Sequence, residues 1–510
     1  MSKAMQPTSR IEFKPMLLSS LSDPEPSADV TISGICDDSR LIQPGDAFLC
    51  MPRAAAQADD FTRMAVEHGA IAVITIARRI GEAVTTGLPS LQLPDMPAAG
   101  TMLRKLLGTD KFGIHCIGIT GTDGKTSIAW MLREALLRRS DKVWSTGTLG
   151  LIRGVSDISD IGNTTPSLMT SHYLMQQAMK EGVDALVMEV SSHGIEQERI
   201  AALPIDTAIW TNLGHDHLQD HGGFEAYTAL KAGFVSETVR RGGMAICNAD
   251  DENIRKLMAE NDTTAHWYAH GLYAGDINHN IDLTWEQELP GMVRFAYRGK
   301  EVCIEDIPAG EFHAENLAAV ALTLIVRFDM EFETLPSLLR EISAPPGRMQ
   351  PLDIGRWQVF IDYAHTPEAL ERCMAAARTL TRNRLIVVFG CGGERDREKR
   401  PEMGAIAVDQ ADLVWITSDN PRGEPPEVIA SEIESGMPKP YPAELFLELD
   451  RQMAIAAAIN IMEPGDTVVI VGKGHETYME IAGHRTPWSD FNIAADCLRL
   501  KEDQRMRLCA

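Results

Sequence analysis

The sequence predicts an α/β protein of three domains, the central one built on a mainly parallel sheet. The chain has 510 residues, which is too many for one hydrophobic core. Apolar strand-like runs alternate with helical segments over most of this length, as they do in parallel sheets with helical crossovers. Polar clusters follow several of the runs, at the ends where open α/β sheets bind ligands.

Residues 1–109 are predicted to form a small N-terminal α/β domain. Strands are expected at 32–35, 47–50 and 70–76, with a helix at 61–68 between the last two. Ser39 and Arg40 follow the first strand and suit a phosphate or a uridine. A turn with a solvated arginine explains the same two residues at least as well.

Residues 110–343 are predicted to form the central domain, which begins with the segment Gly118-Ile-Thr-Gly-Thr-Asp-Gly-Lys-Thr126. An apolar run at 112–119 precedes its glycines, and a helix is expected at 128–138. A glycine-rich turn between strand and helix directs backbone N–H groups at phosphate oxygens. Lys125 would then reach the β- and γ-phosphates, and the Thr126 hydroxyl would bind Mg²⁺. The segment therefore predicts a P-loop ATPase.

Further strands of this domain are expected at 185–190, 208–212 and 244–248. Glu189 ends the first of them, where an acidic residue beside a P-loop commonly anchors Mg²⁺. The cluster Asn212-Leu-Gly-His-Asp-His217 follows the second and could ligate metal. It also resembles the HxDH pattern of zinc hydrolases, but the P-loop favours Mg²⁺ with ATP. Lys231 lies on a predicted helix, where most lysines are solvated.

Residues 344–510 are predicted to form a second doubly wound domain. Its strands are expected at 358–362, 384–389, 412–417 and 467–471, each followed by a polar cluster. Pro345-Pro-Gly347 marks the linker before it.

Composition limits the function classes. The formal net charge of −24 argues against a general nucleic-acid or anionic-membrane binder. The nine cysteines contain no CxxC pair, which fits a reducing cytoplasm without disulfides or a zinc site. Neither a signal peptide nor a membrane-spanning run is expected.

Taken together, these motifs resemble the Mur ligases, and most closely those that add the third residue of the peptidoglycan stem peptide. The resemblance covers almost the whole chain and is highly specific. It rests on Gly-Thr-Asp-Gly-Lys-Thr126, Asn163-Thr-Thr-Pro-Ser167, Glu189-Val-Ser-Ser-His-Gly-Ile-Glu-Gln-Glu-Arg199, Tyr227-x-x-x-Lys231, Gly347-Arg348, Asp362-Tyr-Ala-His-Thr-Pro367, Asp419-Asn-Pro-Arg422 and Gly472-Lys-Gly-His-Glu476.

The resemblance implies a UDP-binding N-terminal domain, a central ATPase and a C-terminal Rossmann-like domain. It also implies an ATP-dependent acid–amino-acid ligase, which adds meso-diaminopimelate to UDP-N-acetylmuramoyl-L-Ala-D-Glu. The acceptor carboxylate takes the γ-phosphoryl group of ATP, and the amino group then attacks the acyl-phosphate. Two Mg²⁺ sites are implied, with Lys231 as N6-carboxylysine, and the enzyme is expected to be a cytoplasmic monomer.

The resemblance also implies roles for the residues that match the family's motifs. The implied catalytic set is Lys125, Glu189, His217 and Lys231, and the metal ligands are Thr126, Glu189, His217 and carbamylated Lys231. ATP contacts are Gly121, Thr122, Asp123, Gly124, Lys125, Thr126, Ser127, Asn316, Arg348 and Asp362. Contacts to the UDP-muramoyl substrate are Ser39, Thr164, Thr165, Ser191, Gln197 and Arg199. The amino-acid pocket comprises Arg395, Asp419, Asn420, Arg422, Gly472 and Glu476.

Three departures from the family pattern keep alternatives open. They are Ala58-Asp-Asp-Phe61, His313 and Gln219. A paralogue could ligate L-lysine or another amino acid to a related acceptor, although Arg422 disfavours lysine. A folylpolyglutamate synthase would lack the N-terminal domain and the Asp-Asn-Pro-Arg422 pocket. A non-catalytic nucleotide-binding subunit is the alternative from another class.

Overall fold

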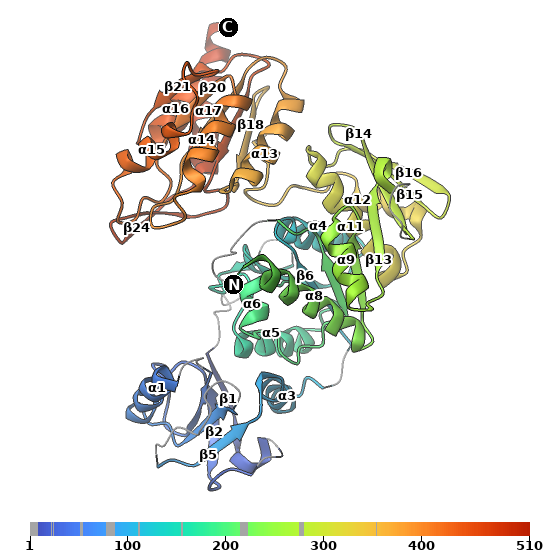
Figure 1. The fold of residues 1–510 in the computed structure, drawn as a ribbon, viewed down its shortest axis with the longest axis vertical. Helices are drawn as coiled ribbons and strands as arrows, with labels where there is room; N and C mark the ends of the chain where they lie inside the picture. The colour runs from blue at the N-terminus through green and yellow to red at the C-terminus, as the bar shows by residue number, and fades with distance from the viewer. Residues whose placement is uncertain are drawn as a thin grey trace. The chain divides into compact units, whose positions relative to one another are not determined.

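The structure is a computed structural model that describes residues 9–21, 23, 25–51, 55–77, 87–110, 113–154, 157–214, 223–274, 280–352 and 354–509. The chain divides into two compact units, residues 1–268 with 279–281 and residues 269–278 with 282–510. Figure 1 shows their elements, and each unit is described separately. Among the described helices, none is both long and apolar enough to cross a membrane.

The N-terminal sheet of the first unit has the strand order β1-β2-β3-β4-β5, and only the β1–β2 pairing is antiparallel. Helix α1 packs on one face of this sheet and helix α3 on the other (Figure 1). All three predicted strands, at 32–35, 47–50 and 70–76, are present as β2, β3 and β4, and the predicted helix is α1, which begins six residues earlier than expected. The elements are β1 Arg10–Leu17, the 3-10 helix η1 Leu18–Leu21, β2 Thr31–Cys36, β3 Asp46–Cys50, α1 Ala55–Glu67, β4 Ala72–Ile76, β5 Ser90–Leu93 and α3 Met96–Leu107.

The central sheet of the first unit is mainly parallel. Strands β7, β10, β6, β11, β12 and β13 lie in this order and run in one direction, and β8 and β9 extend the β7 edge antiparallel. The elements are β6 His115–Thr120, α4 Lys125–Arg138, β7 Val143–Gly147, β8 Gly150–Arg153, β9 Asp157–Ser159, α5 Leu168–Lys180, β10 Ala185–Glu189, α6 Ser192–Glu196, β11 Thr207–Trp210, α8 Phe224–Arg240, β12 Met244–Asn248, α9 Glu252–Glu260 and β13 His266–His270.

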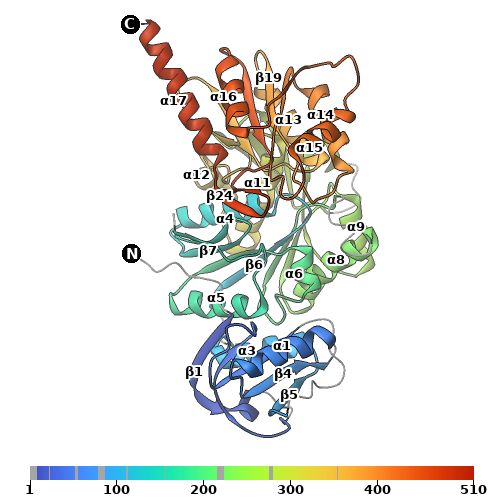
Figure 2. The ribbon, with the colours of Figure 1, turned by 90° about the vertical axis from the view of Figure 1, so that its left-hand side faces the viewer.

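The second unit begins with an antiparallel meander and ends with a doubly wound sheet of strand order β17-β18-β22-β19-β20-β21. Helices α13, α14 and α15 cover one face of that sheet, and α16 and α17 cover the other (Figure 2). The elements are α10 Gly271–Ala274, β14 Leu283–Leu289, β15 Met292–Tyr297, β16 Lys300–Ile304, α11 Glu311–Phe328, the 3-10 helix η2 Phe332–Thr334, α12 Leu335–Leu339, β17 Gln350–Pro351, β18 Gln358–Asp362, α13 Pro367–Leu380, β19 Leu385–Phe389, α14 Lys399–Gln410, β20 Leu413–Ile416, α15 Pro426–Ser435, β21 Glu444–Leu447, α16 Arg451–Ile461, β22 Thr467–Val471, β23 Tyr478–Ile481, β24 His484–Pro487 and α17 Asp490–Cys509.

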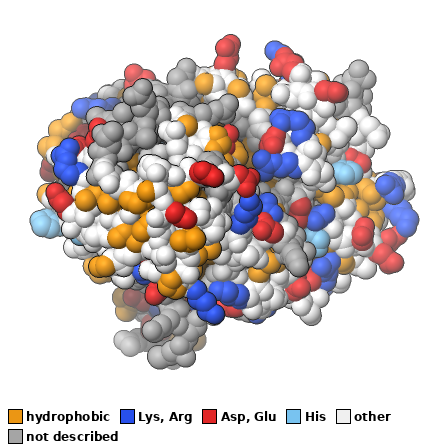
Figure 3. Space-filling model, turned by 90° about the horizontal axis from the view of Figure 1, so that it is seen from below, with side chains coloured by type: hydrophobic (Ala, Val, Ile, Leu, Met, Phe, Trp, Pro, Cys, Tyr) orange, Lys and Arg blue, Asp and Glu red, His pale blue; other side chains and the backbone are white. Residues whose placement is uncertain are grey.

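Acidic and basic side chains are interspersed on the face drawn in Figure 3, although the formal net charge of the chain is −24. On that face the negative charge is not gathered into one acidic surface, so anionic substrates can be met by local basic groups.

Within the first unit, the N-terminal domain packs against the start of α5. Leu168 and Met169 join the apolar core beneath α3, and the Gln176 amide donates to the carbonyl of Leu107 at 2.9 Å. At the same contact the Ser167 hydroxyl donates to Asp37 Oδ2 at 3.4 Å. Burial is the main cause that raises the pKa of Asp37 to about 6, because a charged carboxylate is poorly solvated there.

The buried carboxyl of Asp37 makes stability depend on pH. Its folded pKa lies above the unfolded value, so its stabilising contribution is present at low pH and is lost as pH rises through about 6. We expect Asp37→Asn to approach the stability of the wild type near pH 4 and to be more stable by about 3 kcal/mol above pH 7, because the shift is about two pKa units. The measurement is the thermal unfolding midpoint of the ligand-free protein across this range.

Asp38→Asn is the matched control for this prediction. The guanidinium of Arg40 donates to Asp38 at 2.7 and 2.9 Å and lowers the pKa of this neighbouring carboxyl. The control should therefore lose a little stability at neutral pH. A gain of equal size in both variants would show that general charge removal, and not burial of Asp37, is responsible.

Candidate functional site

The glycine-rich loop joins β6 to α4 at the carboxyl edge of the central sheet. Gly121 and Gly124 have φ values of 148° and 83°, in the region that favours glycine. A Cβ atom on Gly121 would lie 1.8 Å from the Thr211 hydroxyl, so no side chain fits there. Helix α4 begins at Lys125, three residues earlier than predicted. Lys125 and Thr126 therefore form the first turn of the helix, directly after the loop. The loop therefore has the close-packed glycine turn and helix N-terminus that bind phosphate.

Residues that follow β11 hold the loop in place. The Asn212 side chain accepts from the Asp123 N–H at 2.8 Å, and the Thr211 hydroxyl donates to the Asp123 carbonyl at 2.6 Å. Lys125 Nζ donates to the carbonyls of Gly121 and Thr122 at 2.9 and 2.7 Å, so its ammonium lies across the loop. This arrangement fits a triphosphate, because the ammonium is already at the turn that would hold it.

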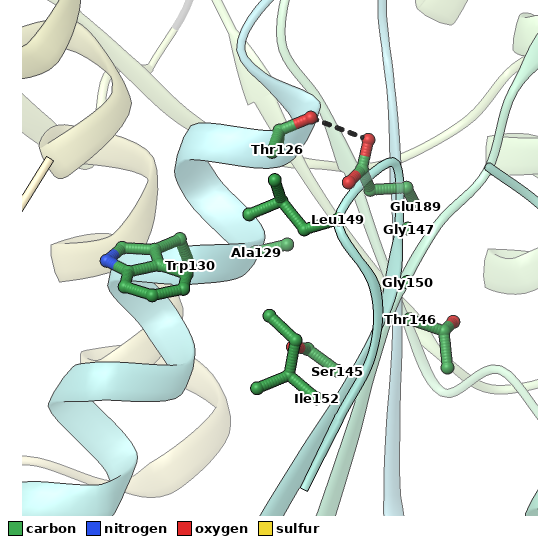
Figure 4. A pocket seen from close by; sticks show the side chains of 10 residues that line it. All are labelled: Thr126, Ala129, Trp130, Ser145, Thr146, Gly147, Leu149, Gly150, Ile152 and Glu189. Atoms are coloured by element: carbon green, nitrogen blue, oxygen red, sulfur yellow. Dashed lines mark hydrogen bonds between the residues drawn. The ribbon is translucent and has the colours of Figure 1, made fainter. Parts of the chain in front are cut away.

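A hydroxyl and a carboxylate suited to Mg²⁺ meet beside the loop. The Thr126 hydroxyl donates to Glu189 Oε2 at 2.9 Å (Figure 4). The parallel pairing of β10 with β6 sets Glu189 opposite Ile119, at the strand end that leads into the loop. Hard oxygen ligands of this kind are the ones that Mg²⁺ prefers, so these two residues fit the metal that the family implies.

Thr148, which sequence reasoning missed, also binds Glu189. Its N–H donates to Glu189 Oε1 at 2.9 Å and its hydroxyl to Oε2 at 3.1 Å. The same hydroxyl lies 3.3 Å from that of Thr164. Thr148 follows β7, and its place after a buried strand was the available signal. Thr148 thus links the Glu189 carboxylate to Thr164, a predicted contact to the UDP-muramoyl substrate.

A shallow recess lies next to Glu189. Figure 4 shows Leu149 and Ile152 pointing toward α4, which carries Ala129 and Trp130, with the polar pair Thr126 and Glu189 at the edge of the recess. The recess is lined by Thr126, Ala129, Trp130, Ser145, Thr146, Gly147, Leu149, Gly150, Ile152 and Glu189.

Lys231 lies on α8 and is only 1% exposed. Its Nζ is 4.4 Å from the centre of the Tyr227 ring, and the Tyr227 hydroxyl is 3.0 Å from that of Thr122 in the glycine loop. A solvated surface lysine is therefore excluded. His217 and Gln219 fall in the segment 215–222, outside the described residues.

Five of the six predicted contacts to the UDP-muramoyl substrate lie together. The Thr165 hydroxyl donates to the Glu189 carbonyl at 3.0 Å and accepts from the Ser191 N–H at 2.9 Å. Arg199 donates to the Thr165 carbonyl at 2.8 Å and to Gln197 Oε1 at 2.7 and 2.9 Å. Thr164 joins them through Thr148. The Ser191 hydroxyl also caps α6 by accepting from the Gly194 N–H at 3.1 Å.

Ser39 is the sixth of these residues and has different neighbours. It is buried, and its hydroxyl lies 3.3 Å from Met64 Sδ. Across the described residues, no hydrogen bond joins Ser39 to the other five predicted contacts. Asp37, two residues before it, accepts a hydrogen bond from Ser167, which ends the segment 163–167.

In the second unit, Asn316, Arg348 and Asp362 are the predicted nucleotide contacts. Asn316 is 6% exposed on α11. Asp362 accepts from the N–H groups of Met349 and Ala364, both at 2.7 Å, and burial raises its pKa. The Arg348 guanidinium lies 4.8 Å from the centre of the Tyr363 ring. Asp362 thus ties the segment after Arg348 to the end of β18.

His313, one of the departures from the family pattern, is completely buried at the start of α11. Burial is the main cause that lowers its pKa to about 3, and a hydrogen bond with the backbone of Arg348 only partly opposes this effect. The ring is therefore neutral at physiological pH.

The six predicted residues of the amino-acid pocket meet at the carboxyl ends of β19, β20 and β22. Asn420 Nδ2 donates to Glu476 Oε2 at 2.8 Å. A Cβ atom on Gly472 would lie 2.8 Å from Asp419 Oδ2, and one on Gly392 would lie 3.1 Å from Arg422 and 3.6 Å from Arg395. Arg422 donates to the Gly393 carbonyl at 2.7 Å. The site therefore offers both carboxylates and guanidinium groups.

A buried ion pair, which the sequence did not predict, contacts the backbone beside this pocket. Arg451 and Asp490 are both completely buried, with a closest distance of 2.6 Å. Arg451 also donates to the carbonyls of Ser418 at 3.2 Å and Val471 at 2.8 Å, just before Asp419 and Gly472. Because the partners lie 39 residues apart, no local pattern indicates the pair.

Comparison with known proteins places this geometry in a family. The Mur ligase middle domain matches residues 119–324, and the Mur ligase glutamate ligase domain matches residues 347–474. A protein of Xanthomonas oryzae pv. oryzae, UDP-N-acetylmuramoyl-L-alanyl-D-glutamate–2,6-diaminopimelate ligase, is 36% identical over 92% of this chain and 94% of its own length. The chain belongs to the Mur ligase family. A ligase of the same name from Aquifex aeolicus is 34% identical over 94% of this chain and 98% of its own length.

Solved structures of Mur ligases share the fold. A UDP-N-acetylmuramoyl-L-alanyl-D-glutamate–2,6-diaminopimelate ligase superposes with a TM-score of 0.68 at 27% identity, over 96% of this chain and all of its own. MurF ligase from Thermotoga maritima, in complex with ADP, superposes with a TM-score of 0.60 at 17% identity, over 92% of this chain and 98% of its own. The predicted three-domain α/β Mur ligase fold is confirmed.

Membership of the Mur ligase family also confirms the predicted class of activity. The chain is an ATP-dependent acid–amino-acid ligase of peptidoglycan biosynthesis. The alternative of a non-catalytic nucleotide-binding subunit is thereby set aside. The roles of individual residues stay predictions.

Proposed function

We propose that this Mur ligase adds meso-diaminopimelate to UDP-N-acetylmuramoyl-L-Ala-D-Glu. The relatives that match it over nearly their whole length carry this activity in their names. The observation that carries the proposal is the clustering of Arg422, Glu476 and Asn420 at one sheet edge. Meso-diaminopimelate has two carboxylates and two ammonium groups, so its pocket needs fixed charges of both signs.

Recognition of the distal end falls to Arg422 and Glu476. The planar guanidinium of Arg422 matches a carboxylate with two parallel hydrogen bonds, and Glu476 can accept from the distal ammonium. A pocket for L-lysine has no second carboxylate to bind and would not need Arg422. Arg395, Asp419, Asn420 and Gly472 complete the proposed pocket, and Arg395 is exposed beside Gly392.

The acceptor is proposed to bind along the hydroxyl-rich loop of the first unit. Thr164, Thr165, Ser191, Gln197 and Arg199 supply hydroxyl, amide and guanidinium groups within one hydrogen-bonded cluster. Ser39 would contact the uridine. These groups orient the acceptor carboxylate beside Glu189 and Lys125.

Bound ATP with Mg²⁺ supplies the phosphoryl group that activates the acceptor carboxylate. The chain must bring two anions together, and Lys125 with the loop N–H groups offsets their repulsion. We include Thr126, Glu189, His217 and carbamylated Lys231 as holders of two Mg²⁺ ions. The position of Lys231 supports its carbamate, because it is buried beside Tyr227, whose hydroxyl lies 3.0 Å from that of Thr122 in the glycine loop. Asn316, Arg348 and Asp362 are proposed nucleotide contacts.

We further propose domain boundaries at 109/110 and 343/344 and a cytoplasmic monomer. Eight of the described cysteines are free thiols.

The test is phosphate release from ATP with UDP-N-acetylmuramoyl-L-Ala-D-Glu and a panel of amino acids. We expect release that depends on meso-diaminopimelate and on the UDP-linked dipeptide together. L-lysine should support less than about a hundredth of this rate, because the charged hydrogen bonds of Arg422 are lost. Preference for another amino acid would overturn the substrate assignment, and silence with the whole panel would indicate a different acceptor.

A further inference from the structure

Lys473 is a buried charge that no predicted role uses. It lies between Gly472 and Glu476 and is completely buried. Its Nζ donates to Glu476 Oε2 at 2.8 Å and to Asn420 Oδ1 at 2.9 Å. A buried ammonium is costly unless it is paired and hydrogen-bonded, and this one satisfies both conditions.

Asn420 and Glu476 complete a closed triangle with Lys473. Asn420 Nδ2 donates to the same Glu476 Oε2 at 2.8 Å, and the Glu480 N–H donates to Asn420 Oδ1 at 2.9 Å. The Asn420 amide therefore has one orientation only, because its oxygen faces two donors and its nitrogen faces a carboxylate. Glu476 Oε2 is held by two donors, while its Oε1 accepts from none of the described residues.

We propose that Lys473 is a positioning residue that holds Asn420 and Glu476, so that Glu476 Oε1 receives the distal ammonium of the incoming amino acid. The inference rests on the proposed function and adds a residue to it. The Glu476 side chain is 19% exposed, whereas Lys473 is sealed, so Glu476 can contact substrate and Lys473 acts only through it. The arrangement fixes the direction of one carboxylate oxygen before substrate binds, which lowers the entropic cost of recognition.

Removing the ammonium should affect one substrate only. In Lys473→Met, Glu476 loses a charged donor and Asn420 Oδ1 loses one of its two donors. We expect the KM for meso-diaminopimelate to rise roughly 30-fold, with the KM values for ATP and the UDP-linked dipeptide within about threefold of the wild type. Lys439→Met is the matched control, since Lys439 forms an exposed pair with Glu434 in the same unit and should leave all three values unchanged.

A double-mutant cycle with Glu476→Gln separates positioning from general damage to the pocket. If Lys473 acts through Glu476, the double variant should have about the same KM as Glu476→Gln alone. Effects that multiply, or a rise in the KM for ATP equal to that for the amino acid, would overturn the inference. If Lys473→Met does not fold, the test uses Lys473→Arg instead. This variant keeps the positive charge but replaces the compact ammonium by a planar guanidinium. A KM for the amino acid unchanged in that variant would also overturn it.

Phosphate release by the wild type distinguishes a failure of this inference from a failure of the proposed function. If wild-type release does not depend on meso-diaminopimelate, the substrate proposal fails, and the cycle is measured with the amino acid that the enzyme accepts. If wild-type release does depend on it and Lys473→Met behaves as wild type, only the role of Lys473 fails.

Discussion

Replacing Lys231 by alanine should lower phosphate release and ligation by at least about a hundredfold. The proposed carbamate would hold a metal ion near the phosphates of ATP, and electrostatic groups of this kind supply several kcal/mol to the transition state. The side chain lies almost fully buried beside Tyr227, which contacts the glycine loop through Thr122. Steady-state phosphate release with both substrates is the measurement.

Short carboxylates test whether the lost group is an anion. Acetate or formate should restore part of the activity of Lys231→Ala, whereas an alkylamine should not. In the wild type, isotope-labelled bicarbonate should give a carbamate carbon signal by NMR that the variant lacks. Lys256→Ala is the control, because Lys256 is 72% exposed and its pair with Glu260 spans 3.9 Å. Full activity in Lys231→Ala, or rescue by the amine instead, would rule out the carbamate.

Arg422→Ala should weaken binding of meso-diaminopimelate far more than binding of ATP. Losing a charged, forked pair with the distal carboxylate costs about 2–4 kcal/mol, which is roughly a 30- to 700-fold rise in KM. In the free protein the guanidinium donates to the Gly393 carbonyl and lies 4.0 Å from Glu480, so it is already directed by its surroundings. The KM values for the three substrates are the measurement.

The backbone at Arg422 is held independently of its side chain. The Arg422 N–H donates to the Glu480 carbonyl at 3.1 Å, and its carbonyl accepts from the Ala482 N–H at 2.7 Å. Arg422→Lys should keep the charge and lose the fork, and so fall between alanine and wild type. Arg499→Ala, at an exposed pair with Asp496, should change nothing. Equal rises in the KM values for ATP and the amino acid would count against the pocket.

Much of the fold could be predicted because its signals are local. The strands at 244–248, 358–362 and 467–471 have the expected bounds, since each is a short apolar run closed by polar or glycine residues. The β14–β16 meander and the edge strand β1 were not predicted. Their residues are only partly buried and mix charged with apolar side chains, so the alternation of apolar and polar residues that indicates a strand is weak.

The candidate site could be predicted as a set of motifs but not as an arrangement. Each motif follows a strand, and parallel strands bring their carboxyl ends to one edge. This is why Thr126 and Glu189, which are 63 residues apart, lie within hydrogen-bond distance. His217 is a predicted ligand that lies outside the described residues, so its place in the set stays a prediction.

The chain alone was sufficient for the glycine loop, its flanking strand and helix, and the family. A loop that approaches phosphate needs glycines, an ammonium and a hydroxyl at adjacent positions, and adjacency is visible in a sequence. Only the tertiary structure revealed how the supporting groups pair. Thr148 meets Glu189 across 41 residues and Lys473 meets Asn420 across 53. Such bonds depend on strand order and register. They also need precise positions of donor and acceptor, because a hydrogen bond weakens steeply with distance and angle.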